Sequence, residues 1–106
     1  MDVVELRESD GTVIEVNLAV SFADRLLGLR RVDPDSALLL RTRSVHGFGM
    51  TRPFLAIGMD GKGRVVGSTV VKPWRMVWFR RCRWVLEMPE WHSPPAVGET
   101  LEWAHA

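Results

Sequence analysis

The sequence contains one cysteine, Cys82, and no long apolar run. A single cysteine cannot form a disulfide within the chain or build a cysteine-rich zinc site, so we interpret it as a small, partly buried apolar residue. Without about 20 consecutive apolar residues, no transmembrane helix is predicted. Residues 1–5 include acidic side chains where a signal peptide needs basic ones, so we expect a soluble, cytoplasmic chain as given.

Motifs of catalysis and nucleotide binding are also missing. The sequence has no Gly-x-Ser-x-Gly nucleophile motif, no Gly-x-Gly-x-x-Gly motif and no phosphate-binding loop. General acid–base chemistry could use His46 with Asp60 or Glu87, but no pattern brings these residues together. We therefore assign no catalytic residue, expect no cofactor, and interpret the chain as a binding or accessory domain, with an enzyme as the alternative.

Acidic residues are scarce in the middle of the chain. Residues 37–86 carry ten Lys or Arg against one acid, Asp60. Residues 1–36 carry eight acids against four bases, and residues 87–106 carry four acids and no Lys or Arg. The total formal charge is only +1. This pattern indicates either a surface that faces an anion or acidic edges folded against a basic centre, and we prefer the second interpretation.

The residues that are present are typical of one globular domain. A chain of 106 residues with 46% apolar residues can bury a core without disulfides, so we expect a single domain over residues 1–106. Alternating and β-branched segments predict a hairpin at the N-terminus, a buried strand in the most apolar run, and several further strands. The expected strands are residues 2–7, 12–20, 37–40, 54–59, 64–71, 84–88 and 97–103.

One segment favours a helix. Ser21 is a suitable N-cap, Phe22 and Leu26 share a helical face, and Gly28 can end the helix in a left-handed conformation. We therefore predict an α+β fold that is mostly β. It is expected to be a compact rolled antiparallel sheet or partly open β-barrel, with one short α-helix at residues 21–28.

The stretch of residues 45–66 organises the chain and contains the first candidate site. His46, Phe48 and Met50 would share one face of a regular strand, where they could line a small pocket or a weak soft-metal site. One histidine and one methionine are too few ligands, so no metal site is predicted. We prefer a histidine whose ring is satisfied by a backbone carbonyl.

A second candidate lies in residues 72–84, where aromatic and basic side chains alternate. Three interpretations stay open: a surface for single-stranded nucleic acid, aromatic residues that close the core beneath solvated arginines, or a loop presented to a protein or an anionic ligand. We prefer the last, with Arg75 as the first anion contact because Trp74 beside it can fix the guanidinium. The predicted ligand-binding residues are His46, Phe48, Met50, Trp74 and Arg75.

Four segments, in this order, resemble one family. They are RLLGL (residues 25–29), SVHGFGM (44–50) running into PFLAIGMD (53–60), KPWR (72–75), and VLE (85–87) followed by VGETL (97–101). This set is similar to the DUF192 (UPF0127) family, a bacterial and archaeal domain of uncharacterised function whose members are often exported. The chain departs from the family pattern at Gly47, at Leu55-Ala56 and at residues 90–93. The resemblance implies one small β-rich domain and no established activity.

Overall fold

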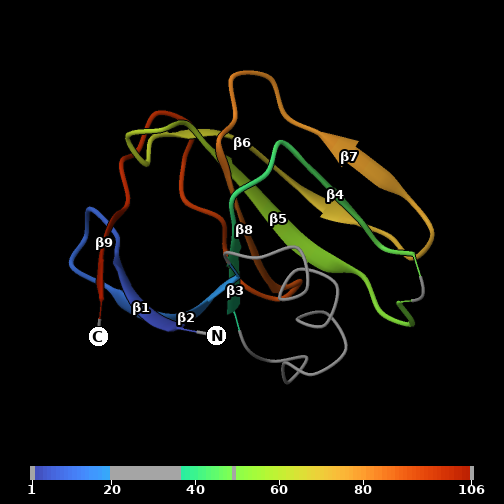
Figure 1. The fold of residues 1–106 in the computed structure, drawn as a ribbon, viewed down its shortest axis with the longest axis horizontal. Coiled ribbons are helices and arrows are strands. Elements are labelled where there is room, and N and C mark those ends of the chain that lie inside the picture. Colours follow the sequence, from blue (N-terminus) through green and yellow to red (C-terminus); the bar gives the residue numbers. More distant parts are fainter. Residues whose placement is uncertain (1, 20–36, 49, 106) are drawn as a thin grey trace.

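The computed structural model describes residues 2–19, 37–48 and 50–105, which form nine strands (Figure 1). The strands are β1 (Asp2–Arg7), β2 (Val13–Ala19), β3 (Ala37–Leu40), β4 (Ser44–His46), β5 (Phe54–Met59), β6 (Val65–Val71), β7 (Met76–Trp78), β8 (Trp84–Pro89) and β9 (Glu102–His105). The expectation of a mostly β chain is confirmed. Six of the seven expected strands are present to within one residue, because alternating and apolar patterns show which side chains face the core. The closing strand was expected at residues 97–103, but β9 starts only at Glu102.

The predicted α+β class is wrong. Within the described ranges the regular structure is all β, and no helix occurs there. The helix itself was predicted for residues 21–28, which lie outside the described residues. The described part of the chain is all β because residues of its strands and loops supply both core clusters.

Seven strands form one sheet in the order β6-β5-β8-β3-β2-β1-β9, and β4 pairs with β7 separately. All neighbouring pairs are antiparallel except β2 and β3, which are parallel. The prediction of a wholly antiparallel sheet is therefore wrong at this one pair. Parallel neighbours need a connection of a dozen or more residues, and residues 20–36 provide that length.

The central strands of this sheet are buried on both faces. Every residue of β3 and of β5 is buried, which explains their uninterrupted apolar sequences. Side chains alternate between two core clusters: Leu39 and Ile57 belong to the first cluster, whereas Leu38 and Ala56 belong to the second. The sheet thus separates two apolar layers.

The sheet curls until its two edges meet at one point. The N–H of Val65, at the start of β6, donates to the Glu99 carbonyl at 2.8 Å, and the N–H of Leu101 donates to the Gly63 carbonyl at 2.9 Å. The only bridge in this region of the described chain joins Arg64 and Thr100, and it does not extend into a ladder. The sheet is therefore rolled but is not a closed barrel.

The two short strands β4 and β7 form an antiparallel ribbon over the second cluster, on the β5–β6 side of the sheet (Figure 1). Val45 and Val77 are directly paired, and both pack against that cluster. Because neighbours along a strand point to opposite faces, the flanking pairs Ser44–Trp78 and His46–Met76 face outward. The ribbon therefore has one apolar inner face and one face open to solvent.

Candidate binding surface

The outer face of the ribbon carries exposed apolar side chains. Trp78 is 72% exposed and Met76 is about half exposed; Phe48, two residues beyond the end of β4, is also about half exposed. Isolated apolar residues are common on protein surfaces, but several together on a small ribbon are typical of an interaction site. The signal in the sequence was the alternation around Val77, which places Met76 and Trp78 on one face. Our prediction named neither of them among the ligand-binding residues.

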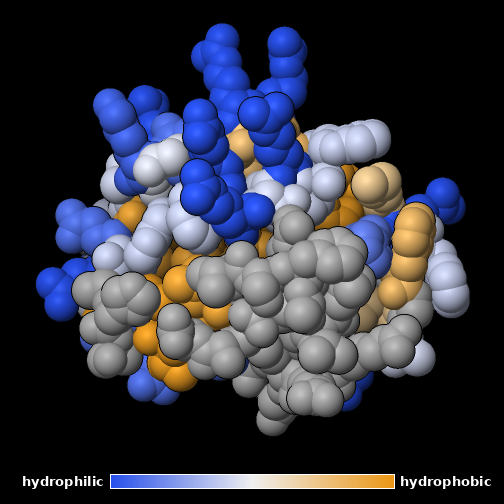
Figure 2. Space-filling model, in the orientation of Figure 1, coloured by the Kyte–Doolittle hydropathy of each residue, from blue (hydrophilic) through white to orange (hydrophobic). Residues whose placement is uncertain are grey.

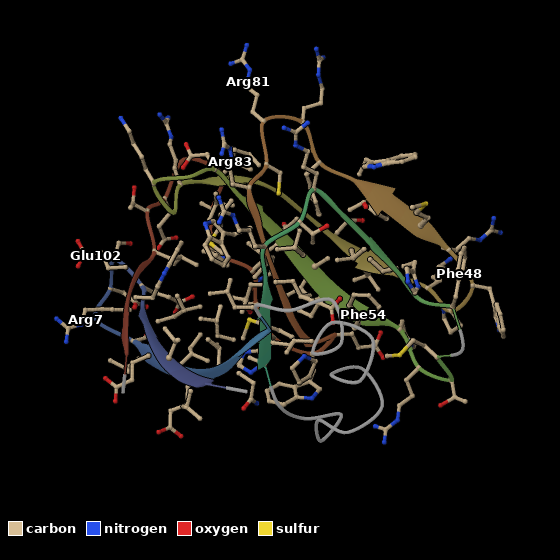
Figure 3. The ribbon with its side chains drawn as sticks, in the orientation of Figure 1. Arg7, Phe48, Phe54, Arg81, Arg83 and Glu102 are labelled. Carbon is tan, nitrogen blue, oxygen red and sulfur yellow. The ribbon has the colours of Figure 1, made fainter. Side chains whose placement is uncertain are left out.

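Three of the five predicted site residues form one stack, which we call the aromatic trio: His46, Phe48 and Trp74. The His46 and Phe48 ring centroids lie 4.8 Å apart, and those of Phe48 and Trp74 lie 6.2 Å apart, with the planes inclined by less than 30° in both pairs. Figure 3 shows Phe48 projecting away from the body of the fold. Trp74, from the segment that follows Lys72, therefore meets His46 through the ring of Phe48.

Gly47 holds the trio together through its backbone. Its N–H donates to the Arg75 carbonyl at 2.8 Å, and its carbonyl accepts the Trp74 N–H at 2.8 Å. A Cβ atom at position 47 would come within 2.6 Å of the Lys72 carbonyl oxygen. Only glycine allows this approach of the two segments, which gives Gly47 a structural role.

Trp74 has an unusual backbone conformation. The Arg75 N–H donates to the Lys72 carbonyl at 3.1 Å and closes a turn with Pro73 and Trp74 at its centre. The φ angle of Trp74 is 64°, in the left-handed region that this turn requires after proline and that glycine or asparagine normally occupies. The side chain is nevertheless 68% exposed. Trp74 therefore occupies a strained position while contributing little to the core.

The ring of His46 has a defined partner. Its Nδ1 accepts the backbone N–H of Phe48 at 3.3 Å, so the neutral imidazole carries its proton on Nε2. This contact corrects our expectation of a backbone carbonyl partner, which would have accepted a proton from the ring. Nε2 is thus the nitrogen of His46 that can donate to a ligand.

Met50, the fourth predicted site residue, lies outside the stack, and so does Trp84 at the end of the basic and aromatic segment. The Met50 side chain is half-buried and packs against the second cluster, so it does not share the face of His46 and Phe48. Trp84 packs against the first cluster and meets Trp103 edge-on at 5.4 Å. Arg75 is exposed beside the trio. The strand-face argument failed for Met50 because β4 ends at His46 and regular alternation stops there.

Two buried groups with unusual chemistry lie away from the trio. Burial raises the pKa of the Glu87 carboxyl from 4.5 to about 8, and this side chain is only 6% exposed. Burial also raises the pKa of the Cys82 thiol, whose Sγ lies 3.1 Å from the Trp84 carbonyl. The burial of Cys82 confirms its interpretation as an apolar packing residue.

Two cavities do not include the trio. The larger, of about 280 Å³, is lined by Val3, Ile14, Glu15, Val16, Asn17, Ala37, Met88, Pro89 and His92. The smaller, of about 200 Å³, is lined by Glu5, Arg7, Val13, Glu102 and Trp103. In the described ranges, no three His, Cys, Asp or Glu side chains gather closely enough to hold a metal ion. The described residues likewise include no helix of the length and apolarity that a membrane crossing requires.

The chain is thus a small, rolled all-β domain with exposed apolar side chains on its β4–β7 ribbon. Comparison with known sequences shows its family. The chain is 37% identical over 100 residues to the UPF0127 protein PH1112 of Pyrococcus horikoshii, covering 84% of this chain and 87% of that protein. It is also 37% identical over 101 residues to the UPF0127 protein PF1050 of Pyrococcus furiosus, covering 85% and 87%. The chain therefore belongs to the UPF0127 family, as its motifs indicated. A scan against protein-family models found no match.

Two solved structures share the fold. A protein of unknown function from Novosphingobium aromaticivorans superposes with a TM-score of 0.75 at 17% identity, covering 95% of this chain and 84% of the other. A putative transcription regulator from Sinorhizobium meliloti superposes with a TM-score of 0.67 at 23% identity, covering 96% and 92%. At these identities the likeness concerns the fold alone.

Proposed function

We propose that this protein is a non-catalytic binding domain whose aromatic trio binds an anionic ligand or an anionic segment of a protein partner. The observation that carries the proposal is the conformation of Trp74. Glycine would adopt its left-handed φ without strain, and the exposed indole adds little buried area. A large aromatic side chain held at a strained surface position is typical of a residue that serves binding.

The charges around the trio support an anionic ligand. Lys72 and Arg75 flank Trp74 in the sequence, Arg52 follows Phe48 closely, and all three are exposed. The one acid of residues 37–86, Asp60, accepts the backbone N–H groups of Lys62 and Arg64 through Oδ1, at 2.8 and 3.0 Å. A ligand with a flat apolar part and a negative charge would thus find stacking surface, arginine and the Nε2 proton of His46 together.

The enzyme alternative receives less support. It needs an enclosed pocket that contains both His46 and a carboxylate. The strongly exposed Trp78 also favours a binding surface over a closed active site.

Naphthalene-2-sulfonate is a suitable probe because it combines a flat aromatic ring with one negative charge. Its binding can be followed by two-dimensional NMR through the Trp74 indole N–H and the backbone N–H of Gly47. We expect Trp74→Gly to weaken binding at least about fivefold, as for residues that contribute more than 1 kcal/mol at interfaces. The same variant should match or exceed the stability of the parent protein, because glycine relieves the strain.

The matched control is Trp91→Ala. Trp91 is 69% exposed and stacks on a histidine, His92, at 4.3 Å, but it lies in the segment after β8. Binding by this variant should equal that of the parent protein. The proposal would be wrong if the parent protein showed no saturable binding, or if Trp91→Ala lost as much affinity for the probe as Trp74→Gly. Neutral 2-naphthol, which lacks the anion, should bind more weakly than the sulfonate.

A further inference from the structure

Five exposed arginines gather on two neighbouring loops, and we call them the arginine rim: Arg41, Arg43, Arg80, Arg81 and Arg83. The loop after β3 and the loop after β7 are joined by the Phe79 N–H, which donates to the Arg43 carbonyl at 3.0 Å. The Cys82 thiol adds a contact to the Thr42 carbonyl at 3.5 Å. These bonds bring arginines from two parts of the sequence to one end of the molecule.

The rim projects from the molecule as a positively charged edge. Figure 3 shows Arg81 at the tip of the loop and Arg83 nearer its base. Hydrophilic side chains project from the same end in the space-filling view (Figure 2). All five basic residues of the rim are arginines, whose planar guanidinium binds phosphate through two parallel hydrogen bonds.

The conformation of Arg81 is a second, independent sign of a binding role. Its φ angle is 56°, so Arg81 and Trp74 are the two non-glycine residues with positive φ in the described part of the chain. Arg81 is exposed, and glycine would take this conformation without strain. Fold stability therefore does not explain an arginine at this position.

An aromatic surface adjoins the rim. Trp78 ends β7 directly before the loop and pairs with Ser44, the residue after Arg43. Its indole is 72% exposed on the outer face of the ribbon. Grooves that combine arginines with exposed aromatic rings bind single strands, because unpaired bases can stack on the rings while phosphates meet the charges. A duplex keeps its bases stacked inside and cannot use Trp78 in this way.

We infer that the arginine rim and Trp78 form a binding site for single-stranded nucleic acid, with phosphates on the arginines and a base stacked on Trp78. The inference is independent of the proposed function because it uses no residue of the aromatic trio. Sequence alone left nucleic acid as the less favoured partner. The structure changes this balance by joining Arg41 and Arg43 to the later arginines and by exposing Trp78 beside them.

The test uses a fluorescently labelled oligothymidylate of about twelve nucleotides, a length within the usual site size of domains that bind single strands. Fluorescence anisotropy should show saturable binding at about 50 mM salt and much weaker binding at about 200 mM salt. Arg81→Gly should weaken binding severalfold. It should also make the negative slope of log K against log salt shallower by about 0.7, the contribution of one phosphate contact on a single strand. Trp78→Ala should weaken binding about 5- to 150-fold with an unchanged slope.

Two matched controls separate this site from general attraction between charges. Arg7→Ala removes an exposed arginine from β1, and Trp91→Ala removes an equally exposed tryptophan elsewhere. Both should bind as the parent protein does. Equally tight binding of duplex DNA, heparin or polyglutamate, with no effect of Trp78→Ala, would overturn the inference and show a surface for any polyanion. Absence of saturable binding at low salt would overturn it too, while leaving the naphthalene-sulfonate experiment on the trio unaffected.

Discussion

The ring of Phe79 lies where a side chain on Gly58 would be. A Cβ atom built on Gly58 would come within 2.6 Å of Phe79 Cγ, and one built on its partner Gly67 would come within 3.3 Å of Phe79 Cδ1. The half-buried ring thus covers a pair of glycines on β5 and β6 and packs against the second cluster. This contact anchors the loop that carries the arginine rim onto the sheet.

We expect Gly58→Ala to lower the free energy of unfolding by about 1–3 kcal/mol, because the ring must leave its position. Urea denaturation measures this change. Gly67→Ala should cost less, since its nearest contact is longer and can be relieved by a small shift. The double variant Gly58→Ala/Phe79→Ala should lose less than the sum of its parts. Equal losses in the two glycine variants would contradict this account.

The close approach at Gly47 gives a second prediction. Gly47→Ala should cost about 1–3 kcal/mol, because the new methyl group meets backbone atoms of Lys72 and Pro73 rather than a flexible side chain. The stacking of Phe48 on Trp74 should weaken with it, which the ring-current shifts of the Trp74 indole would report. Gly61→Ala is the control, since its Cβ would meet only Arg83 Cγ at 3.7 Å. An unfolding free energy of Gly47→Ala equal to that of the control would show that the two segments can separate freely.

Glu87 predicts how stability depends on pH. Leu38 and Ala56 flank it in register, and burial raises its pKa from 4.5 to about 8. Between these two values the folded state keeps a proton that the unfolded state releases, so stability should fall as pH rises. The loss should be at least about 1 kcal/mol, because one pKa unit corresponds to about 1.4 kcal/mol.

The Glu87→Gln variant should lack this contribution, and thermal unfolding from pH 5 to about 8 compares the two proteins. As pH rises across this range, the melting temperature of the parent protein should fall relative to that of the variant. Glu102→Gln, which removes an exposed carboxyl on β9, should follow the parent profile. Parallel profiles for Glu87→Gln and the parent protein would show that Glu87 titrates normally in the folded state.

Cys82 should react slowly with thiol reagents. It is 2% exposed, and burial raises its pKa despite the nearby Arg43, so little thiolate is available. We expect native protein to react at least about a hundredfold more slowly than protein in denaturant, because the loop must first open. Absorbance with a chromogenic disulfide reagent follows both rates. A fast reaction of the native protein would mean that the loop that holds Cys82 against Thr42 and Trp84 is open in solution.

The positions of most strands could be predicted from the sequence. Alternation in residues 12–20 and the apolar runs 37–40 and 54–59 directly reflect which faces are buried, and burial is a local property of a strand. The pairing of β2 with β3 could not be predicted in the same way. Its parallel direction depends on where the chain returns to the sheet after residues 20–36, which no local pattern encodes.

The candidate site was likewise predicted only in part from the sequence. Residue types marked His46, Phe48, Trp74 and Arg75 as candidates, and the structure brings these four together around Gly47. Met50 was misplaced because regular alternation ends with β4. Membership of the UPF0127 family was also readable from the ordered motifs.

What the sequence by itself determined is the β character of this protein, its apolar strands and its family, because each depends on side-chain identity along the chain. Tertiary structure alone decided which face of the ribbon meets solvent, that Trp74 and Arg81 adopt positive φ, and that arginines forty residues apart share one edge. The physical reason is that these properties arise from backbone contacts between distant segments, such as the bond from Phe79 to Arg43. Such contacts depend on how the whole sheet curls.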